Sequence, residues 1–173
     1  LSAGIHQVRA ALADELDREN QKRQTIEESH IAEAMAQVAE SSAGLVLASE
    51  KWHPGVIGIV AARVVERFHR PAVLIAVRNG EGKGSVRSVP GLDVVRVLAA
   101  CGSHLVKFGG HKQAAGLTVA ADEIPAFRAA FDAEVRSALE NVEPSPVWLD
   151  ERLSLDEISG EKVDELERLE PFG

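Results

Sequence analysis

Hydrophobic and polar positions divide the chain into segments of different periodicity. Residues 3–40 contain no Pro and a single Gly, and they are rich in helix-forming residues, which predicts one long helix. The stretch 14–28 is mostly charged or amide-bearing, as expected of a solvated or domain-bridging helix, and a break near Asn20 is compatible with it. Residues 41–44 end this helix, and the apolar run 45–48 predicts a buried strand.

A parallel crossover unit is expected next. Residues 53–55, His-Pro-Gly, open a helix that is apolar around most of its circumference as far as Phe68, with Pro54 in its first turn. Pro71 ends this helix, and the apolar run 72–77 predicts a second strand. A strand, a buried helix and a strand in this order form a parallel unit with a right-handed crossover.

The central part of the chain alternates further strands and helices. Strands are expected at 83–88 and 117–119, helices at 93–101 and 122–141, and a glycine-rich segment at 108–116. Together with the crossover unit, these segments predict an α/β fold. It consists of a mixed β-sheet flanked by helices and is preceded by a long helical connector.

Composition divides the chain into three parts. Residues 1–42 are expected to form the helical connector and residues 43–143 the α/β domain. Residues 144–173 begin with a Pro-Ser-Pro linker, continue with a short strand at 147–149 and an acidic helix at 160–169, and are interpreted as the start of another domain. The chain begins with Leu and ends with Pro-Phe-Gly, so both ends are interpreted as cut from a longer protein.

Composition and charge narrow the classes of function. A single cysteine excludes a disulfide framework and a cysteine-based zinc site, and it fits the reducing cytoplasm. No apolar run approaches the roughly 18 residues of a membrane span. The net charge of −8 conceals an asymmetry, because residues 51–120 carry ten Lys and Arg against three Asp and Glu, whereas both flanks are acidic. A basic centre attracts phosphates locally, although basic helix faces alone also explain the asymmetry.

Two segments of the basic centre carry candidate chemistry. The first is the strand 82–88, on which Lys83, Ser85 and Arg87 share one face, because alternate side chains of a strand point the same way. An ammonium group, a hydroxyl and a guanidinium in one row suit the binding of a phosphate. An edge strand protected by charge is the structural alternative.

The second segment is 108–116, with the sequence Phe-Gly-Gly-His-Lys-Gln-Ala-Ala-Gly. Paired glycines let backbone N–H groups approach an anion, since no Cβ stands in the way, and His111 and Lys112 add donors. We interpret Gly109, Gly110 and His111 as a turn, while spacing alone leaves open a plain glycine turn beside an incidental histidine. The basic centre contains no paired-aspartate motif from which a metal-dependent hydrolase site could be built.

Together and in this order, these segments resemble the DHH-associated domain of the RecJ family of single-stranded-DNA exonucleases. The resemblance is carried by Trp52 to Ala61 (WHPGVIGIVA), Arg70-Pro71, the strand 82–88 (GKGSVRS) and the segment 108–116 (FGGHKQAAG). The last segment is shared across the wider DHH superfamily, whereas the helix that contains HPGVIGIVA and the strand GKGSVRS are typical of RecJ. Residues 16–24 resemble that family's connecting helix, and residues 169–173 resemble the beginning of the oligonucleotide-binding barrel that follows.

The resemblance implies the part of the enzyme that binds nucleic acid, without the domain that holds the catalytic metals. In the family, aspartates and histidines of the DHH domain bind two Mn²⁺ or Mg²⁺ ions, so neither catalytic residues nor metal ligands are expected here. By the same resemblance, Ser85 and Arg87 hold the 5′-terminal phosphate. The segment 109–111, ending in His111, contacts the terminal nucleotide or the scissile phosphate, and Lys83 and Lys112 contact the nucleic-acid backbone.

The function implied for the full-length protein is hydrolysis of single-stranded DNA from its 5′ end in DNA repair and recombination. The expected partners are single-stranded DNA, a helicase and a single-strand-binding protein, and the chain is expected to be a cytoplasmic monomer. Two alternatives remain: a DHH-type oligoribonuclease or phosphoesterase, and a non-catalytic nucleic-acid-binding module like the C-terminal domain of alanyl-tRNA synthetase. A comparison of the full-length protein's activity on long DNA and on short RNA distinguishes the exonuclease from the first alternative. An aminoacylation domain upstream in the gene would reveal the second alternative.

Overall fold

The chain divides into two compact units, residues 1–143 and residues 144–173. The computed structural model describes residues 2–140, 152, 154 and 158–168. The predicted linker and short strand at 144–149 therefore lie outside the described residues. The first unit carries all the candidate site residues.

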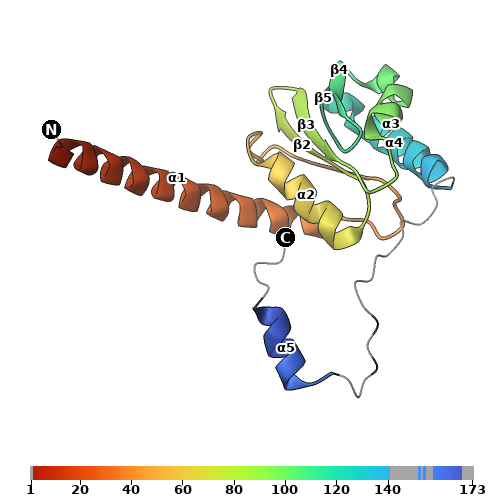
Figure 1. The fold of residues 1–173 in the computed structure, drawn as a ribbon. Coiled ribbons are helices and arrows are strands. Elements are labelled where there is room, and N and C mark those ends of the chain that lie inside the picture. Colours follow the sequence, from red (N-terminus) through yellow and green to blue (C-terminus); the bar gives the residue numbers. More distant parts are fainter. Residues whose placement is uncertain (1, 141–151, 153, 155–157, 169–173) are drawn as a thin grey trace. The chain divides into compact units, whose positions relative to one another are not determined.

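The predicted long helix is confirmed as α1 (Ser2–Gln37), a single helix of 36 residues. Its C-terminal part lies beside α2, and its N-terminal part extends beyond the sheet (Figure 1). The suggested break near Asn20 is wrong. The Asn20 amide oxygen accepts hydrogen bonds from Arg23, whose Nη1 lies 2.7 Å from Glu27 Oε2. Such pairs, three and four residues apart, link successive turns of a polar helix.

One mixed sheet forms the centre of the first unit. In spatial order its strands are β1 (Leu45–Ser49), β2 (Ala72–Arg78), β3 (Glu81–Arg87), β5 (Ala114–Ala120) and β4 (Lys107–His111). β1 and β2 are parallel and are joined by α2 (Ile57–Phe68), and every other pair of neighbours is antiparallel. The predicted α/β architecture with a mixed sheet is thus confirmed.

The glycine–histidine segment is a strand, and its prediction as a turn is wrong. Gly109, Gly110 and His111 lie in β4, and the chain reverses at residues 112–113. Gly110 has a φ of 152°, and a Cβ at this position would lie 2.5 Å from the carbonyl oxygen of Ala114. Glycine is therefore needed here for the close approach of two strands and not for a reversal of the chain.

The flanking helices lie close to their predicted positions. They are α3 (Val94–Ala100) and α4 (Ile124–Leu139), and the 3₁₀ turn η1 (Gly102–His104) follows α3, while the 3₁₀ turn η2 (Ala121–Glu123) precedes α4. The carboxylate of Asp93 caps α3 by accepting hydrogen bonds from two backbone N–H groups of its first turn. α2 begins later than predicted, because the N–H groups of Val56 and Ile57 bond to the carbonyl of His53. Pro54 consequently lies in a turn before the helix.

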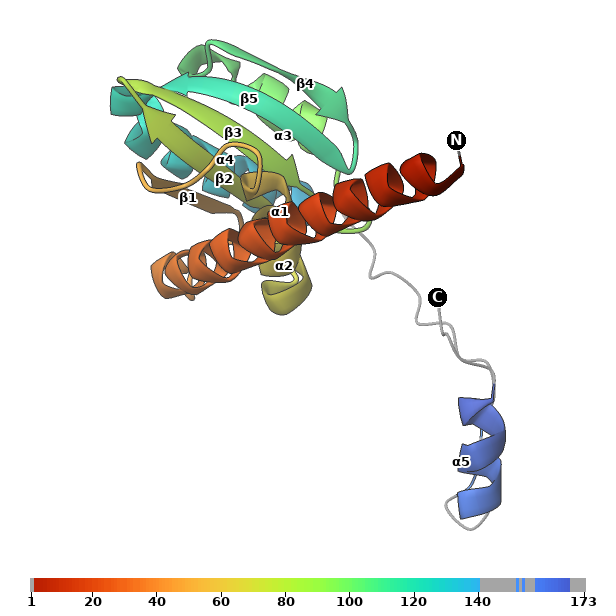
Figure 2. The same ribbon diagram turned by 90° about the vertical axis from the view of Figure 1, so that its left-hand side faces the viewer.

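The sheet separates two hydrophobic cores. On one face, α2 and the end of α1 pack on β1 and β2 around the fully buried Trp52. On the other face, α3 and α4 pack on the sheet around Phe127 and Phe131. Figure 2 shows α1 and α2 on the side of β1 and β2, whereas β5 and β4 lie beyond them. Among the described helices of the first unit, none covers the face of β5 and β4 on the α2 side.

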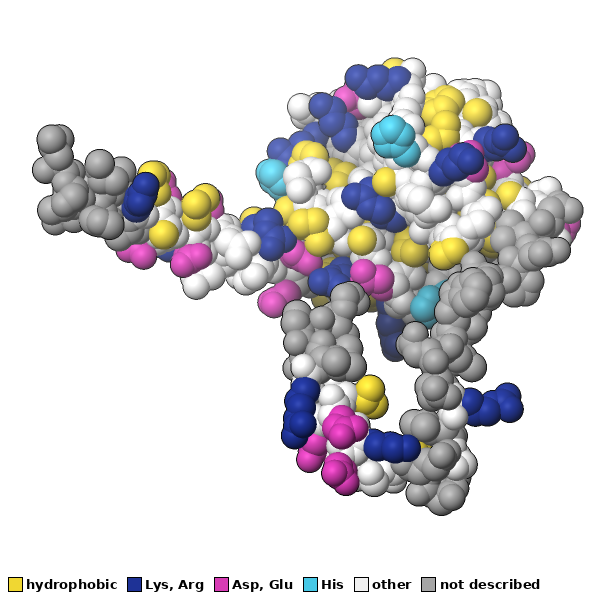
Figure 3. Space-filling view, viewed as in Figure 1, with side chains coloured by type: hydrophobic (Ala, Val, Ile, Leu, Met, Phe, Trp, Pro, Cys, Tyr) yellow, Lys and Arg dark blue, Asp and Glu magenta, His cyan; other side chains and the backbone are white. Residues whose placement is uncertain are grey.

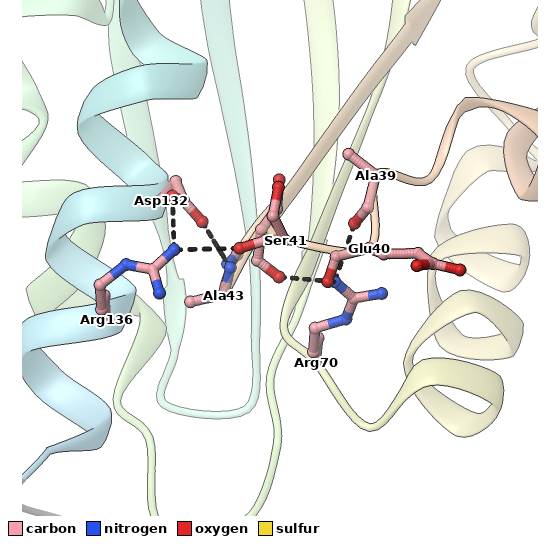
Figure 4. Close-up of polar contacts among 9 residues, drawn as sticks. Ala39, Glu40, Ser41, Ala43, Arg70, Asp132 and Arg136 are labelled. Atoms are coloured by element: carbon pink, nitrogen blue, oxygen red, sulfur yellow. Dashed lines mark hydrogen bonds and ion pairs between the residues drawn. The ribbon is translucent and has the colours of Figure 1, made fainter.

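Two arginines and an aspartate fix the junction between α1 and β1 (Figure 4). Arg70 Nη1 donates to three backbone carbonyls of the segment 39–42, at 2.6 to 3.2 Å. Asp132 on α4 accepts hydrogen bonds from the N–H groups of residues 43–44, and Arg136 Nη2 donates to Asp132 Oδ2 at 3.1 Å. These contacts satisfy the backbone groups where the long helix ends and the sheet begins.

The second unit contains α5 (Gly160–Glu167), which confirms the predicted acidic helix. Ser159 caps it, because its Oγ accepts a hydrogen bond from the N–H of Lys162. Among the helices in the described part of the chain, none is both long enough and apolar enough to cross a membrane.

Candidate nucleic-acid interface

The predicted donors lie on the α2 side of β3, β5 and β4. The strand register gives three rows of neighbouring residues: Arg87–Ala114–His111, Ser85–Gly116–Gly109 and Lys83–Thr118–Lys107. Paired residues of antiparallel strands point to the same face. We call the surface formed by these nine residues the open sheet face. The intervening residues Val86, Ala115 and Leu117 are buried against α3 and α4 on the opposite face, so Lys83, Ser85 and Arg87 do share one face.

Arg87 and Ser85 lie where α2 stops covering the sheet. Both side chains are half-buried, and Arg87 Nη1 donates to Ser85 Oγ at 3.2 Å and to the carbonyl of Val86 at 2.9 Å. Gly58 of α2 faces them, since a Cβ there would lie 3.1 Å from Arg87 Nη2 and 3.2 Å from Ser85 Oγ. Within the described residues the guanidinium is in no ion pair, so no carboxylate neutralises it there.

The middle of the open sheet face is almost without side chains. A Cβ at Gly109 would meet no heavy atom within 4 Å, and one at Gly116 would come no closer than 3.8 Å, to the carbonyl of Gly84. Both glycines are exposed, as is His111. His111 lies in the same row as Arg87, two strands away, or roughly 10 Å at ordinary strand spacing. The exposed backbone of Gly116 and Gly109 lies in the row next to theirs.

Gly110 and Lys112 lie elsewhere. Gly110 belongs to the opposite face of β4 and meets the backbone of β5, so its role is structural. Lys112 is exposed in the turn after β4, and its carbonyl accepts a hydrogen bond from Val94 at the start of α3. Of the seven residues predicted for the site, five therefore share the open sheet face: Lys83, Ser85, Arg87, Gly109 and His111.

A hollow of about 410 Å³ lies on the open sheet face. Its lining includes Lys83 and Lys107, which lie on either side of Thr118, together with Gly109 and Gly116. Figure 3 shows several Lys, Arg and His side chains over the strands of this unit. Sequence reasoning missed Lys107, because a residue two positions before Gly109 shares its face only if the segment is a strand.

The described residues do not supply a ligand set for a catalytic metal. No three His, Cys, Asp or Glu side chains in this part of the chain lie close enough together to hold an ion. The open sheet face itself carries one histidine and no carboxylate, whereas Mg²⁺ and Mn²⁺ prefer carboxylate oxygens. The arrangement is suited to binding and orienting an anion.

Comparison with known proteins identifies the family. The model of the DHHA1 domain matches residues 35–137. The single-stranded-DNA-specific exonuclease RecJ of Bacillus subtilis (strain 168) is 34% identical over 168 residues, which cover 94% of this chain and 21% of that protein. RecJ of Thermus thermophilus is 40% identical over 123 residues, which cover 71% of this chain and 18% of that protein.

Solved structures agree with these relatives. The crystal structure of RecJ from Thermus thermophilus in complex with Mg²⁺ matches with a TM-score of 0.75 at 36% identity, covering 94% of this chain and 26% of that chain. A RecJ structure bound to manganese matches with a TM-score of 0.67 at 37% identity, covering 76% and 34%. The chain spans about a fifth of the length of these two curated relatives. From the match over residues 35–137, the chain belongs to the DHHA1 domain family.

Proposed function

We propose that this chain is the nucleic-acid-binding part of a single-stranded-DNA-specific 5′–3′ exonuclease that acts in DNA repair and recombination. The observation that carries the proposal is the open sheet face, where cations and a histidine surround exposed glycine backbone. The relatives at 34% and 40% identity are both single-stranded-DNA-specific exonucleases, and they favour this function over the oligoribonuclease and synthetase alternatives.

The 5′-terminal phosphate is proposed to bind Ser85 and Arg87. A guanidinium offers a planar fork of N–H donors that fits two phosphate oxygens, and charged hydrogen bonds of this kind are stronger than neutral ones. Arg87 is already oriented by Ser85 and by the Val86 carbonyl, while Gly58 leaves space for it. Little side-chain entropy is then lost when the phosphate binds.

The nucleotide that follows is proposed to lie across β5 towards β4. His111 and the backbone at Gly109 contact the terminal nucleotide or the scissile phosphate, and Lys83 and Lys112 contact the sugar–phosphate backbone. These contacts bind phosphate groups and do not distinguish one base from another. Such sequence-independent binding suits an enzyme that degrades any sequence. We also propose that residues 1–42 are the helical connector, that residues 43–143 are the nucleic-acid-binding domain, and that residues 144–173 begin the next domain.

Catalytic metal ions are proposed to be Mn²⁺ or Mg²⁺, held outside the described residues. RecJ structures have been obtained with each of these ions. Such ions polarise a phosphodiester and lower the pKa of a bound water. In this chain, the residues of the open sheet face bind the strand and hold its 5′ end in position. We further propose that the full-length protein is a cytoplasmic monomer that works with a helicase and a single-strand-binding protein.

The test compares the full-length protein and this chain on the same substrates. The full-length protein should degrade long 5′-phosphorylated single-stranded DNA with Mn²⁺, and should degrade RNA of a few nucleotides far more slowly. This chain alone should bind the DNA and cleave nothing. Preferential cleavage of the short RNA would replace the proposal by an oligoribonuclease, and Mn²⁺-dependent cleavage by this chain would contradict its non-catalytic role.

A further inference from the structure

We propose that Lys107, Lys83 and Arg78 form a second phosphate-binding region, which contacts successive internal phosphodiesters of the single strand beyond the scissile one. The inference rests on the proposed function, because it takes the 5′ end to be held by Ser85 and Arg87. Its ligand is the backbone of a single-stranded nucleic acid, inward from the terminal nucleotide. Arg78 belongs to none of the three rows of the open sheet face.

The register aligns the three cations on one side of the sheet. Lys107, Thr118, Lys83 and Ala76 are successive neighbours across β4, β5, β3 and β2. Ala76 packs in the core beneath α2, so Arg78, two positions further along β2, belongs to the same face. The cations thus lie on three strands of one surface, with small side chains between them.

Two hollows connect these cations. The hollow of about 410 Å³ on the open sheet face is lined by Lys107 and Lys83. A second hollow of about 410 Å³ is lined by Lys83 together with Arg78, Asn79 and Pro54. Lys83 lines both hollows, so its side chain forms part of the wall of each. We take the two hollows as the path of the strand from β4 to the β2–β3 hairpin.

The cations are available for a ligand. Lys107, Lys83 and Arg78 are all exposed, and within the part of the chain that is described none of them is in an ion pair. By contrast, Arg63 on α2 lies 3.0 Å from Glu66. An exposed cation without a carboxylate partner gains more from a phosphate than one that must first give up an ion pair.

The second phosphate-binding region is distinct from the 5′-phosphate site. Lys83 and Arg87 are four residues apart on β3, which is roughly 13 Å along an extended strand. One phosphate group cannot contact both side chains at that separation. The strand would therefore pass from Arg87 across β5 to β4, continue past Lys107 and Lys83, and leave over the β2–β3 hairpin.

The carboxylate of Glu81 lies beside this path, and removing its charge should change the affinity in the opposite direction to removing a cation. Glu81 lines the second hollow and pairs with Arg78 in the register of β2 and β3. It is exposed, and its negative charge repels a phosphate that passes Arg78. Glu81→Gln should therefore tighten binding. A damaged fold cannot produce such a gain.

The experiment uses the 173-residue chain and fluorescence anisotropy with two 5′-phosphorylated oligothymidylates, one of twelve nucleotides and one of two. Lys107→Gln and Arg78→Gln should each weaken binding of the longer strand about fivefold at 0.1 M salt, and should lower the slope of log affinity against log salt by about 0.7. Binding of the dinucleotide and the preference for a 5′-phosphate over a 5′-hydroxyl should not change. Arg67→Gln, an exposed charge on α2 outside both hollows, is the matched control.

The outcomes separate the inference from the proposed function. If both variants bind the longer strand with the wild-type salt slope, or if Arg67→Gln weakens it equally, the second phosphate-binding region is wrong while the 5′-phosphate site stands. A lack of tightening with Glu81→Gln, when Glu134→Gln on α4 serves as the control acid, also counts against the second phosphate-binding region. If the wild-type chain shows no preference for a 5′-phosphate, the proposed function fails, and the inference fails with it.

Discussion

Gly58 of α2 and Arg87 of β3 lie so close together that a Cβ at position 58 would stand 3.1 Å from Arg87 Nη2. The same Cβ would stand 3.2 Å from the hydroxyl oxygen of Ser85. The guanidinium therefore occupies the place that a side chain of α2 would otherwise fill. This contact, with the hydrogen bonds to Ser85 and the Val86 carbonyl, fixes Arg87 at the border of the open sheet face.

Gly58→Ala should separate stability from binding. The new methyl group displaces the end of the Arg87 side chain by a few tenths of an ångström, which weakens 5′-phosphate binding. Alanine is favoured over glycine inside a helix by about 1 kcal/mol, so thermal unfolding should show an unchanged or higher midpoint. Loss of stability together with unchanged binding would mean that Gly58 serves helix packing and not the position of Arg87.

Gly109→Ala and Gly110→Ala should behave oppositely, although the two glycines are adjacent. Gly110→Ala forces a Cβ to within 2.5 Å of the β5 backbone at a φ of 152°, and we expect a destabilisation of about 2 kcal/mol or more. Gly109→Ala meets nothing within 4 Å, so the free energy of unfolding should hardly change. The methyl group nevertheless blocks approach to the backbone, and affinity for single-stranded DNA should fall. Urea unfolding and anisotropy measure the two effects, and undiminished affinity of Gly109→Ala would remove Gly109 from the interface.

Asp132 holds the junction between α1 and the sheet. Burial raises the pKa of its carboxyl, but the N–H groups of residues 43–44 and the guanidinium of Arg136 outweigh this and keep the pKa below its ordinary value. Asp132→Ala leaves these donors without their acceptor and should destabilise the fold by about 2 kcal/mol, measured by urea unfolding. Glu134→Ala, an exposed change on the same helix, should have little effect. Equal effects of the two variants would show that the junction contributes nothing specific.

His30 of α1 should make stability depend on pH. It is buried, and its Nε2 accepts a hydrogen bond from the backbone N–H of His53 at 2.9 Å. Burial lowers the pKa of His30; Glu33 opposes this shift and His53 adds to it. The unfolded chain takes up a proton below about pH 6.5 while the folded chain resists it. The free energy of unfolding should therefore fall as pH decreases below about 6.5.

Urea unfolding between pH 7.5 and pH 5 tests this dependence. His30→Gln keeps an acceptor for the His53 N–H without a group that titrates in this range, so its stability should change less with pH than that of the wild type. Parallel pH profiles for the two proteins would show that His30 does not contribute to acid sensitivity.

The sequence could predict the order of elements because apolar runs and helix-forming stretches are local signals. The crossover from β1 through α2 to β2 follows from the order of strand, buried helix and strand, and the shared face of Lys83, Ser85 and Arg87 follows from strand periodicity. The strand β4 could not be recognised, because its glycines are typical of turns and only pairing with β5 explains them. Lys107 was missed for the same reason, and Gly58 could not be related to Arg87 before the packing of α2 was known.

The central claim is that Arg87 binds the 5′-terminal phosphate, and the most direct measurement compares strands that end in a 5′-phosphate or a 5′-hydroxyl. The affinities of the wild-type chain and of Arg87→Ala are measured for both, with Arg67→Ala as the control. A charged hydrogen bond contributes about 1.5–3 kcal/mol, so Arg87→Ala should reduce the preference for the phosphorylated strand about tenfold or more, and Arg67→Ala should retain it. If Arg87→Ala distinguishes the two ends as well as the wild type does, Arg87 does not read the 5′ end.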